Sequence, residues 1–347
     1  MGNNLLISFL LVVFEIAAPA AEGSQHFDSQ QTLPSSCPAP DPTLNHRPAI
    51  GIVCHPGDGA SGRLSNATNI SYIAASYVKF AEMAGARVIP LIYTAPPEIL
   101  NQKLNLVNGI IFTGGWAKDG LYFDVIKGIF QKALAKNDAG EHFPILAICL
   151  GYELLTMIIT KDNNILEEFS AASQASTVQF VENVNIEGTV FGRYMFVYSP
   201  MLLKKMSIDC LVMQNHHFGI SPERFLANKD LSGFFRVLTT STDENNKVYV
   251  STIQAKRYPI AGFQWHPEKN VFEWGSSRIP HSEDAVQVTT HVANYFISEA
   301  RKSSNKPVAR EVLDNLIYNY SPIYGGKAGK GFDEVYLFTP HSALSYL

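Results

Sequence analysis

Short apolar runs alternate along the chain with segments in which apolar residues recur at helical spacing. The runs at residues 48–53, 87–92 and 110–112 are bounded by glycine, proline or polar residues, which is typical of buried strands. Between the first two runs, apolar residues three or four positions apart predict a helix over residues 70–81. This alternation predicts an α/β fold with a doubly wound, mostly parallel central sheet and helices on both faces. Such sheets bind their ligands at the carboxyl ends of the strands.

The composition is that of a globular protein with a large core, and it limits the partners. Of the 347 residues, 46% are hydrophobic, which is enough for one large domain or two. The net charge of −4 and the lack of a basic stripe argue against nucleic acid as a partner. The 4 cysteines form no C-x-x-C pair and no spaced His/Cys cluster, so we expect no metal and no cofactor. A single disulfide, for instance between Cys37 and Cys54, stays open.

The apolar run at residues 144–148 leads directly into Cys149, and this junction is the strongest chemical signal in the sequence. Ala147 and Gly151 lie two positions before and after the cysteine, where a nucleophile elbow tolerates only small residues. In such a turn the following helix N-terminus stabilises a thiolate, and the amide of Leu150 points at an oxyanion. A cysteine buried within a strand is the alternative interpretation, because free cysteine is among the most buried residue types.

Two further motifs supply the partners that such a nucleophile needs. A later apolar run ends at His266, and Glu268 follows two residues on, where it can accept a hydrogen bond from the imidazole and fix its tautomer. The run at residues 110–112 opens into Gly114 and Gly115. We assign Gly114 to substrate binding and the amide of Gly115 to the oxyanion hole, since glycine amides can approach a carbonyl closely. Together the motifs predict a cysteine hydrolase with a Cys-His-Glu triad whose thiolate and imidazolium form an ion pair.

In their order along the chain, the Gly-Gly, Cys and His-Pro-Glu motifs resemble the class I glutamine amidotransferase-like family of hydrolases. Within that family the chain is similar to the plant-type γ-glutamyl hydrolases over about residues 47–300, a resemblance carried by four segments: residues 73–80, 84–88, 149–153 and 264–269. The resemblance implies cleavage of γ-glutamyl bonds in a small-molecule substrate, a folylpoly-γ-glutamate, through a thioester on Cys149, with release of glutamate or short polyglutamates. Ala147 departs from the glycine that amidotransferases usually carry there, but alanine is also small and we expect no loss of chemistry.

Three more residues are candidate substrate contacts. The resemblance aligns His216 with a family histidine that would contact a substrate carboxylate, although an N-x-H pattern selects His217 and a structural role is equally open. Glu153, one turn into the elbow helix, would hydrogen-bond the substrate amine, or it is a carboxylate stabilised by the helix dipole. Lys269 would attract the polyglutamate tail, with a solvated surface lysine as the simpler interpretation.

The N-terminus predicts targeting rather than chemistry, and the C-terminal tail gives no functional signal. An apolar run of about ten residues followed by an A-x-A pattern predicts a secretory signal peptide over residues 1–20 and no membrane association of the mature protein. An N-terminal extension over residues 21–46, a catalytic domain over residues 47–302 and a polar, glycine-rich tail over residues 303–347 follow. We expect the secretory pathway, with the vacuole favoured over the cell wall and exterior. Sequons predict glycosylation at Asn66, Asn69 and Asn319.

Two other functions would use the same motifs. A glutamine amidotransferase shares the chemistry but passes ammonia to a second domain, for which the sequence has no room. A γ-glutamyl-binding paralogue with weak catalysis is disfavoured, because all three catalytic positions are intact. The sequence leaves a homodimer open. The signal peptide and the family resemblance imply activity that is best in mildly acidic conditions. Such conditions need not abolish the chemistry, because a stabilised thiolate persists below the ordinary cysteine pKa.

Overall fold

The computed structural model divides the chain into two compact units, residues 1–41 and 42–347, and the second holds every candidate catalytic residue. No helix among the described residues is long and apolar enough to cross a membrane. The predicted signal peptide and the sequons at Asn66 and Asn69 lie outside the described residues. The structure describes residue 37 and residues 39–59, 70–182, 184–192, 200–325 and 331–339.

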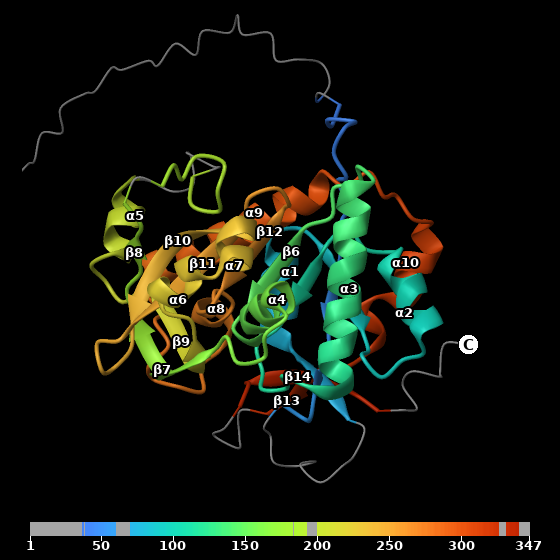
Figure 1. Cartoon of the computed structure of the whole chain (residues 1–347). Coiled ribbons are helices and arrows are strands. Elements are labelled where there is room, and N and C mark those ends of the chain that lie inside the picture. Colours follow the sequence, from blue (N-terminus) through green and yellow to red (C-terminus); the bar gives the residue numbers. More distant parts are fainter. Residues whose placement is uncertain are drawn as a thin grey trace, which may run out of the picture. The chain divides into compact units, whose positions relative to one another are not determined.

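Among the described residues, an eight-stranded sheet forms the centre of the second unit (Figure 1). In sheet order its strands are β4 (Arg87–Leu91), β1 (Ala49–Val53), β5 (Ile110–Phe112), β6 (Ile145–Ile148), β12 (Ile260–Phe263), β11 (Val248–Ala255), β10 (Phe235–Thr242) and β8 (Gln179–Phe180). The strands from β4 to β12 run parallel to one another, whereas β11, β10 and β8 extend the sheet in antiparallel pairs. The predicted α/β fold with a mostly parallel sheet is confirmed.

Helices cover both faces of this sheet because successive side chains of its buried strands point to opposite sides. In β1, Ile50 and Ile52 join one hydrophobic cluster, while Ala49 and Val53 join the other. The first cluster packs against α1 (Ala75–Met83), α5 (Pro200–Met206), α8 (Lys269–Phe272) and α9 (Glu283–Arg301). The second packs against α2 (Pro97–Leu104), α3 (Gly120–Asp138), α4 (Leu150–Thr160), α6 (Pro222–Ala227), α7 (Lys229–Phe234) and α10 (Ala309–Asn315).

Two smaller sheets flank the carboxyl ends of the parallel strands. One is antiparallel, in the order β13 (Ile323–Tyr324), β14 (Glu334–Phe338), β3 (Ser71–Ala74) and β2 (His55–Pro56); the other pairs β7 (Glu167–Ser176) with β9 (Val212–Gly219). The prediction of a continuous helix from residue 70 is wrong in its first turn. Ile73 and Ala74 pair with β14, more than 250 residues later in the sequence. These residues adopt an extended conformation because pairing with β14 satisfies their backbone hydrogen bonds.

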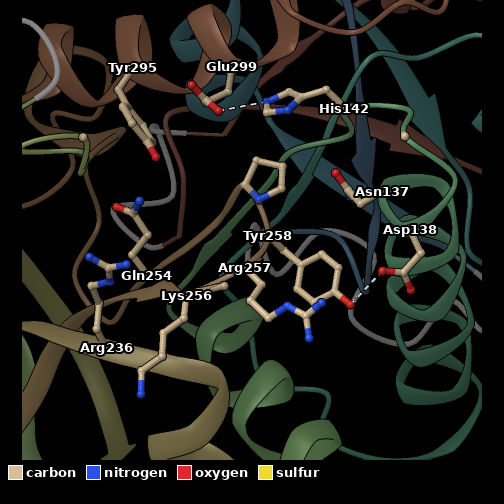
Figure 2. Close-up of a pocket in the computed structure, with 14 residues that line it drawn as sticks. Asn137, Asp138, His142, Arg236, Gln254, Lys256, Arg257, Tyr258, Tyr295 and Glu299 are labelled. Carbon is tan, nitrogen blue, oxygen red and sulfur yellow. Dashed lines mark hydrogen bonds and ion pairs between the residues drawn. The ribbon is translucent and has the colours of Figure 1, made fainter.

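A cavity of about 630 Å³ opens at the amino ends of β6 and β12 (Figure 2). In its wall the Tyr258 hydroxyl donates a hydrogen bond to Asp138 over 2.9 Å, and His142 Nε2 lies 2.8 Å from a Glu299 carboxylate oxygen. The cavity is also lined by the cations Arg236, Lys256 and Arg257. Cys149 follows the carboxyl end of β6, so this cavity lies at the opposite edge of the sheet from the predicted nucleophile. Parallel sheets bind their substrates at the carboxyl ends of the strands, and this cavity is therefore not the expected substrate site.

The segment beyond residue 302, which we expected to be a polar tail, adds secondary structure to the same compact unit. Val312 of α10 packs into the second hydrophobic cluster, and Phe338 of β14 packs into the first. A 3-10 helix, Ile317–Asn319, follows α10. Asn319, the remaining candidate glycosylation site, is exposed at its end.

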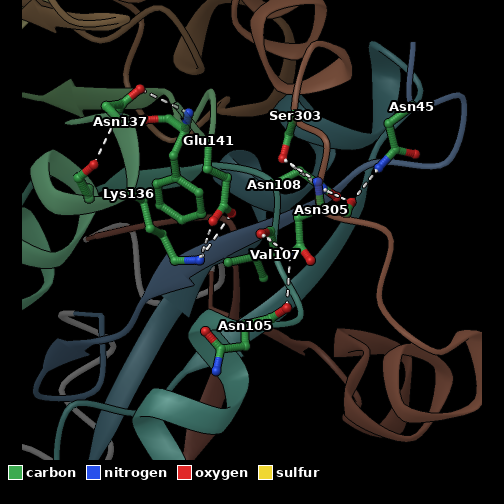
Figure 3. Close-up of polar contacts among 11 residues, drawn as sticks. Asn45, Asn105, Val107, Asn108, Lys136, Asn137, Glu141, Ser303 and Asn305 are labelled. Carbon is green, nitrogen blue, oxygen red and sulfur yellow. Dashed lines mark hydrogen bonds and ion pairs between the residues drawn. The ribbon is translucent and has the colours of Figure 1, made fainter. Parts of the chain in front are cut away.

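Asparagine side chains tie the chain after α9 to the start of β5 (Figure 3). Asn108 Nδ2 donates to Ser303 Oγ over 3.2 Å and to the carbonyl of Asn305 over 2.7 Å. In return, Asn305 Nδ2 donates to the carbonyls of Asn105 and Val107 over 2.8 and 3.1 Å. These bonds satisfy carbonyls that the end of α2 and the following turn leave open, so the segment is a structural part of the fold.

A buried carboxyl group, Glu273, holds the start of the β14 segment. Its Oε2 accepts a hydrogen bond from the amide of Asp333 over 2.9 Å, and burial raises the pKa of Glu273 to about 7 against the opposing charge of Lys269. A carboxyl group with a raised native pKa stabilises the fold at acidic pH, and this contribution is lost as pH rises through about 7.

The free energy of unfolding of Glu273→Gln, measured relative to the wild type, should therefore increase by roughly 2 to 3 kcal/mol as pH rises from 5 to 8. The reason is that glutamine keeps the hydrogen-bond acceptor and cannot ionise. Urea unfolding at the two pH values measures the change. Glu98→Gln, at an exposed position of α2, is the control and should show no trend. A pH-independent difference for Glu273→Gln would contradict the assignment.

Candidate active site

Cys149 lies in the turn between β6 and α4 with φ 53° and ψ −107°, a strained backbone conformation for an L-residue. The turn is tight because it packs against β5: a Cβ atom at Gly151 would lie 2.5 Å from the carbonyl oxygen of Phe112. The Cys149 amide donates to the carbonyl of Phe263 over 2.7 Å, which fixes the turn to β12. The predicted nucleophile elbow is present, and the close approach to Phe112 requires a small residue at position 151.

The charge state of the thiol differs from the predicted thiolate. The Leu150 amide donates a hydrogen bond to Cys149, which favours the thiolate, but burial raises the pKa of the thiol and the nearby Glu153 and Glu268 carboxylates raise it further. The thiol also lies 3.8 Å from the carbonyl oxygen of Asn215, to which only the protonated form donates. Desolvation outweighs the helix terminus, so the closed site favours a neutral thiol.

His266 follows β12, and its position relative to the cysteine is set by strand pairing. Phe263, the last residue of β12, pairs with Ile148, the last residue of β6, so both strands deliver their next residues to the same edge of the sheet. His266 Nδ1 lies 2.8 Å from Glu268 Oε1, and both side chains are buried. The predicted base and its orienting carboxylate are thus in hydrogen-bond contact, as general-base chemistry requires.

The two groups have complementary charge states. Burial raises the pKa of Glu268, but the adjoining His266 ring and then Lys269 bring it below its ordinary value, so the group is a carboxylate. Burial lowers the pKa of His266 more than Glu268 raises it, so the ring is neutral. A carboxylate only accepts, which places the proton on Nδ1 and a lone pair on Nε2. Among the described residues, Nε2 makes no hydrogen bond of good geometry, and a contact with the backbone of Asn215 is the smallest influence on the pKa of the ring.

Gly114 lies between the nucleophile and the base. A Cβ atom there would lie 2.9 Å from His266 Cε1 and 3.3 Å from Cys149 Cβ. Its amide donates to the Tyr77 hydroxyl over 2.9 Å. Gly115 follows with φ 153°, in the region that favours glycine. The structure therefore brings together the three motifs that the sequence singled out, while the use of the Gly115 and Leu150 amides as oxyanion donors stays a prediction.

His216 lies in the interior, on strand β9 rather than on the expected loop. The residue is 4% exposed, and its ring nitrogens contact the carbonyl of Phe218 over 2.8 Å and Gln214 Oε1 over 3.2 Å. Burial lowers the pKa of His216 to about 3, so the ring is neutral. These are the contacts of a structural histidine, and its role as a carboxylate contact stays a prediction. His217 is exposed and lines a separate cavity of about 470 Å³.

Glu153 is buried in the first turn of α4, where it has two partners that the sequence did not indicate. Lys118 Nζ lies 2.9 Å from one carboxylate oxygen, and Gln264 Nε2 donates to the other over 3.3 Å. Burial raises the pKa of Glu153, and Lys118 opposes that change. Lys269 is buried rather than solvated, with Nζ 4.8 Å from the centroid of the Phe332 ring.

Tyr77, Lys118 and Gln264 contact the site residues, and sequence analysis assigned none of them a role. Tyr77 fits the apolar face of a helix, and Lys118 lies in a loop without a motif. Gln264 belongs to a quoted motif, but nothing local distinguishes it from a strand residue. Only their three-dimensional contacts identify them, since each acts on a residue distant in sequence.

All four cysteines are among the described residues, and each is a free thiol. Cys37 and Cys54 belong to different units, so a bridge between them stays a prediction. Cys54 is buried, its Sγ lies 3.1 Å from Ser71 Oγ, and burial raises its pKa to about 11. In the described part of the chain, no group of three His, Cys, Asp or Glu side chains could hold a metal ion.

Comparison with known proteins agrees with this geometry. The model of the peptidase C26 family matches residues 48–268. Gamma-glutamyl hydrolase 2 of Arabidopsis thaliana is 66% identical over 308 residues, which cover 89% of this chain and 88% of that protein. Gamma-glutamyl hydrolase of Glycine max is 50% identical (97% of this chain, 100% of that protein), and that of Mus musculus is 35% identical (87% and 94%).

Among solved structures, a glutamine amidotransferase from Methylobacillus flagellatus covers 76% of this chain and 97% of its own, with a TM-score of 0.41 and 10% identity. That likeness is too low to add to the argument from the sheet. The family match and the relatives each span most of this chain, including the elbow and the histidine motif. The chain therefore belongs to the peptidase C26 family of cysteine-type γ-glutamyl hydrolases.

Proposed function

We propose that the protein hydrolyses the γ-glutamyl bonds of folylpoly-γ-glutamates through a thioester on Cys149, with His266 and Glu268 completing the triad. The observation that carries the proposal is the contact of His266 Nδ1 with Glu268 at the sheet edge where the Cys149 elbow lies. The names of the relatives support the bond that is cleaved. The folate half of the substrate and the compartment, the secretory pathway with the vacuole favoured, rest on resemblance.

The chemistry follows from the charge states. His266 Nε2 takes the proton of the Cys149 thiol as the sulfur attacks the γ-glutamyl carbonyl carbon, so the nucleophile is generated at the moment of attack. The amides of Leu150 and Gly115 hold the resulting oxyanion, each contributing about 3 kcal/mol of transition-state stabilisation. The imidazolium, stabilised by Glu268, then protonates the departing amine. Water hydrolyses the thioester with His266 as the base.

This mechanism also permits the activity that we expect in mildly acidic conditions, by a different route from the expected thiolate. The base must be neutral, and burial keeps the pKa of His266 below its ordinary value. The ring therefore remains a proton acceptor at a pH where an exposed histidine is charged.

The test is incubation of the purified protein with pteroylpentaglutamate at pH 5 to 6, with chromatographic separation of the products. We expect shortened pteroylglutamates together with glutamate or short γ-glutamyl peptides. The same compound with α-linked glutamates is the control and should stay intact. Ammonia release from free glutamine, with pteroylpentaglutamate unchanged, would instead support an amidotransferase activity and contradict the proposal.

A further inference from the structure

A second histidine, His55 of β2, is buried beside the glycine loop of the active site. Its ring is enclosed edge-on by three aromatic rings, at centroid distances of 5.5 Å from Tyr72, 5.3 Å from Trp116 and 5.1 Å from Tyr122. The three rings come from a strand, a loop and a helix that are distant in sequence. Enclosure of this kind fixes the plane of the imidazole and therefore the direction of both ring nitrogens.

The hydrogen bonds of His55 define its tautomer. Nδ1 lies 2.7 Å from the carbonyl oxygen of Pro56, a contact in which only a protonated nitrogen is favourable. Nε2 accepts from the amides of Trp116 and Ala117 over 3.0 and 3.2 Å. The ring is thus a neutral imidazole with Nδ1 protonated, and its lone pair holds the two amides that directly follow Gly115.

The ring also contacts Gly115 itself. A Cβ atom at Gly115 would lie 2.3 Å from both Cδ2 and Nε2 of His55, so the imidazole occupies the space that any other side chain would need. On the other side of the loop, the Tyr77 hydroxyl accepts from the amide of Gly114. The segment 114–117 is therefore held at both ends, and Gly115 is the residue between the two anchors.

We propose that His55 is a positioning residue for the oxyanion loop, residues 114–117, and that its neutral Nε2 fixes the Gly115 amide toward the reacting carbonyl. The inference rests on the proposed function, because Gly115 matters only if an oxyanion forms there. The contacts of His55 are with the loop and not with Cys149, His266 or Glu268. Its effect on the reaction is therefore on the position of the oxyanion donor in the transition state. A misplacement of about 1 Å in such a donor costs up to ~100-fold in rate.

The same arrangement makes the loop sensitive to acid. Protonation would turn Nε2 into a donor that faces the amides of Trp116 and Ala117, which are donors as well. Burial lowers the pKa of His55 to about 4; the bond to Pro56 opposes the change, and Lys118 adds to it. Among the groups packed on the ring, Tyr72 and Tyr122 stay neutral, because burial raises their pKa values. The loop should stay intact in a mildly acidic compartment and fail below about pH 4.

The test compares His55→Phe, which keeps a ring and removes the acceptor, with His55→Gln, whose amide oxygen can accept the same bonds and does not titrate. Steady-state kinetics on pteroylpentaglutamate are measured from pH 3.5 to 7, with amide hydrogen exchange of the peptide that contains residues 114–117. We expect kcat of His55→Phe to fall about 10- to 100-fold with KM within about two-fold, and exchange in the loop to quicken about ten-fold or more. His55→Gln should stay within about five-fold of wild-type kcat, and below pH 4 its loop exchange should not quicken as that of the wild type does.

The control is His142→Phe, at the opposite edge of the sheet (Figure 2), which should lower stability without changing kcat or loop exchange. Equal kcat losses in the Phe and Gln variants, or unchanged loop exchange in a folded His55→Phe, would overturn the inference. Should His55→Phe not fold, loop exchange in His55→Gln that quickens below pH 4 as much as in the wild type overturns it. Wild-type protein that leaves pteroylpentaglutamate intact contradicts the proposed function instead, and the exchange measurement still tests the His55 contacts.

Discussion

Cys149→Ala is expected to reduce hydrolysis of γ-glutamyl substrates by at least ~10⁴-fold while substrate affinity changes little. The sulfur forms the covalent intermediate and contributes far more to the transition state than to ground-state binding. His266→Asn should cause a similar loss, and the double variant should be scarcely worse than either single one, because the two side chains transfer one proton between them. Single-turnover kinetics and equilibrium binding of pteroylpentaglutamate measure the two effects separately.

Cys54→Ala and Cys210→Ala are the matched controls for loss of a thiol. Cys54 is buried, so its replacement should lower stability by about 1 to 3 kcal/mol without removing turnover. Cys210 is exposed, and its replacement should change neither property. Residual activity above about one per cent in desalted Cys149→Ala protein would remove Cys149 as the nucleophile, and with it the thioester mechanism.

The parts of the fold that local patterns encode could be predicted. Buried parallel strands form continuous apolar runs, so β1, β4, β5 and β6 were visible as runs, and the elbow was visible because its steric demand falls on residues within two positions of Cys149. The strand β3 was hidden within a helical pattern, since its pairing partner β14 lies near the other end of the chain. The role of residues beyond 302 was missed because it depends on distant asparagine contacts.

The candidate site divides in the same way. Cys149, His266 and Glu268 were identified because each lies in a short motif whose spacing reflects its chemistry. Tyr77 and His55 act on the loop 114–117 through contacts that no local spacing expresses. The expected thiolate–imidazolium ion pair is disfavoured in the structure for a related reason. Sequence shows the helix terminus that favours a thiolate, but the desolvation that outweighs it depends on everything packed around the sulfur.

Glu268→Gln is expected to lower kcat by about 10³- to 10⁴-fold with little change in KM. Glutamine has nearly the same volume, so the effect comes from charge and hydrogen bonding. If its amide group donates to Nδ1 of His266, the imidazole proton moves to Nε2, and the lone pair needed to take the thiol proton is lost. If its oxygen accepts instead, the tautomer is kept but the imidazolium formed during attack loses its carboxylate.

The pH dependence distinguishes this role from a purely structural one. The Glu268 charge raises the pKa of His266 against the larger lowering by burial, so without that charge the pKa falls further. The acidic limb of kcat/KM for Glu268→Gln should therefore move to lower pH, although the maximum is much smaller.

Glu299→Gln is the control, since Glu299 is also a buried carboxylate next to a histidine, at the other edge of the sheet (Figure 2). That variant should lose stability and keep its pH profile. If Glu268→Gln keeps kcat within about ten-fold of the wild type and its acidic limb does not shift, then Glu268 does not orient or stabilise His266 in the reaction.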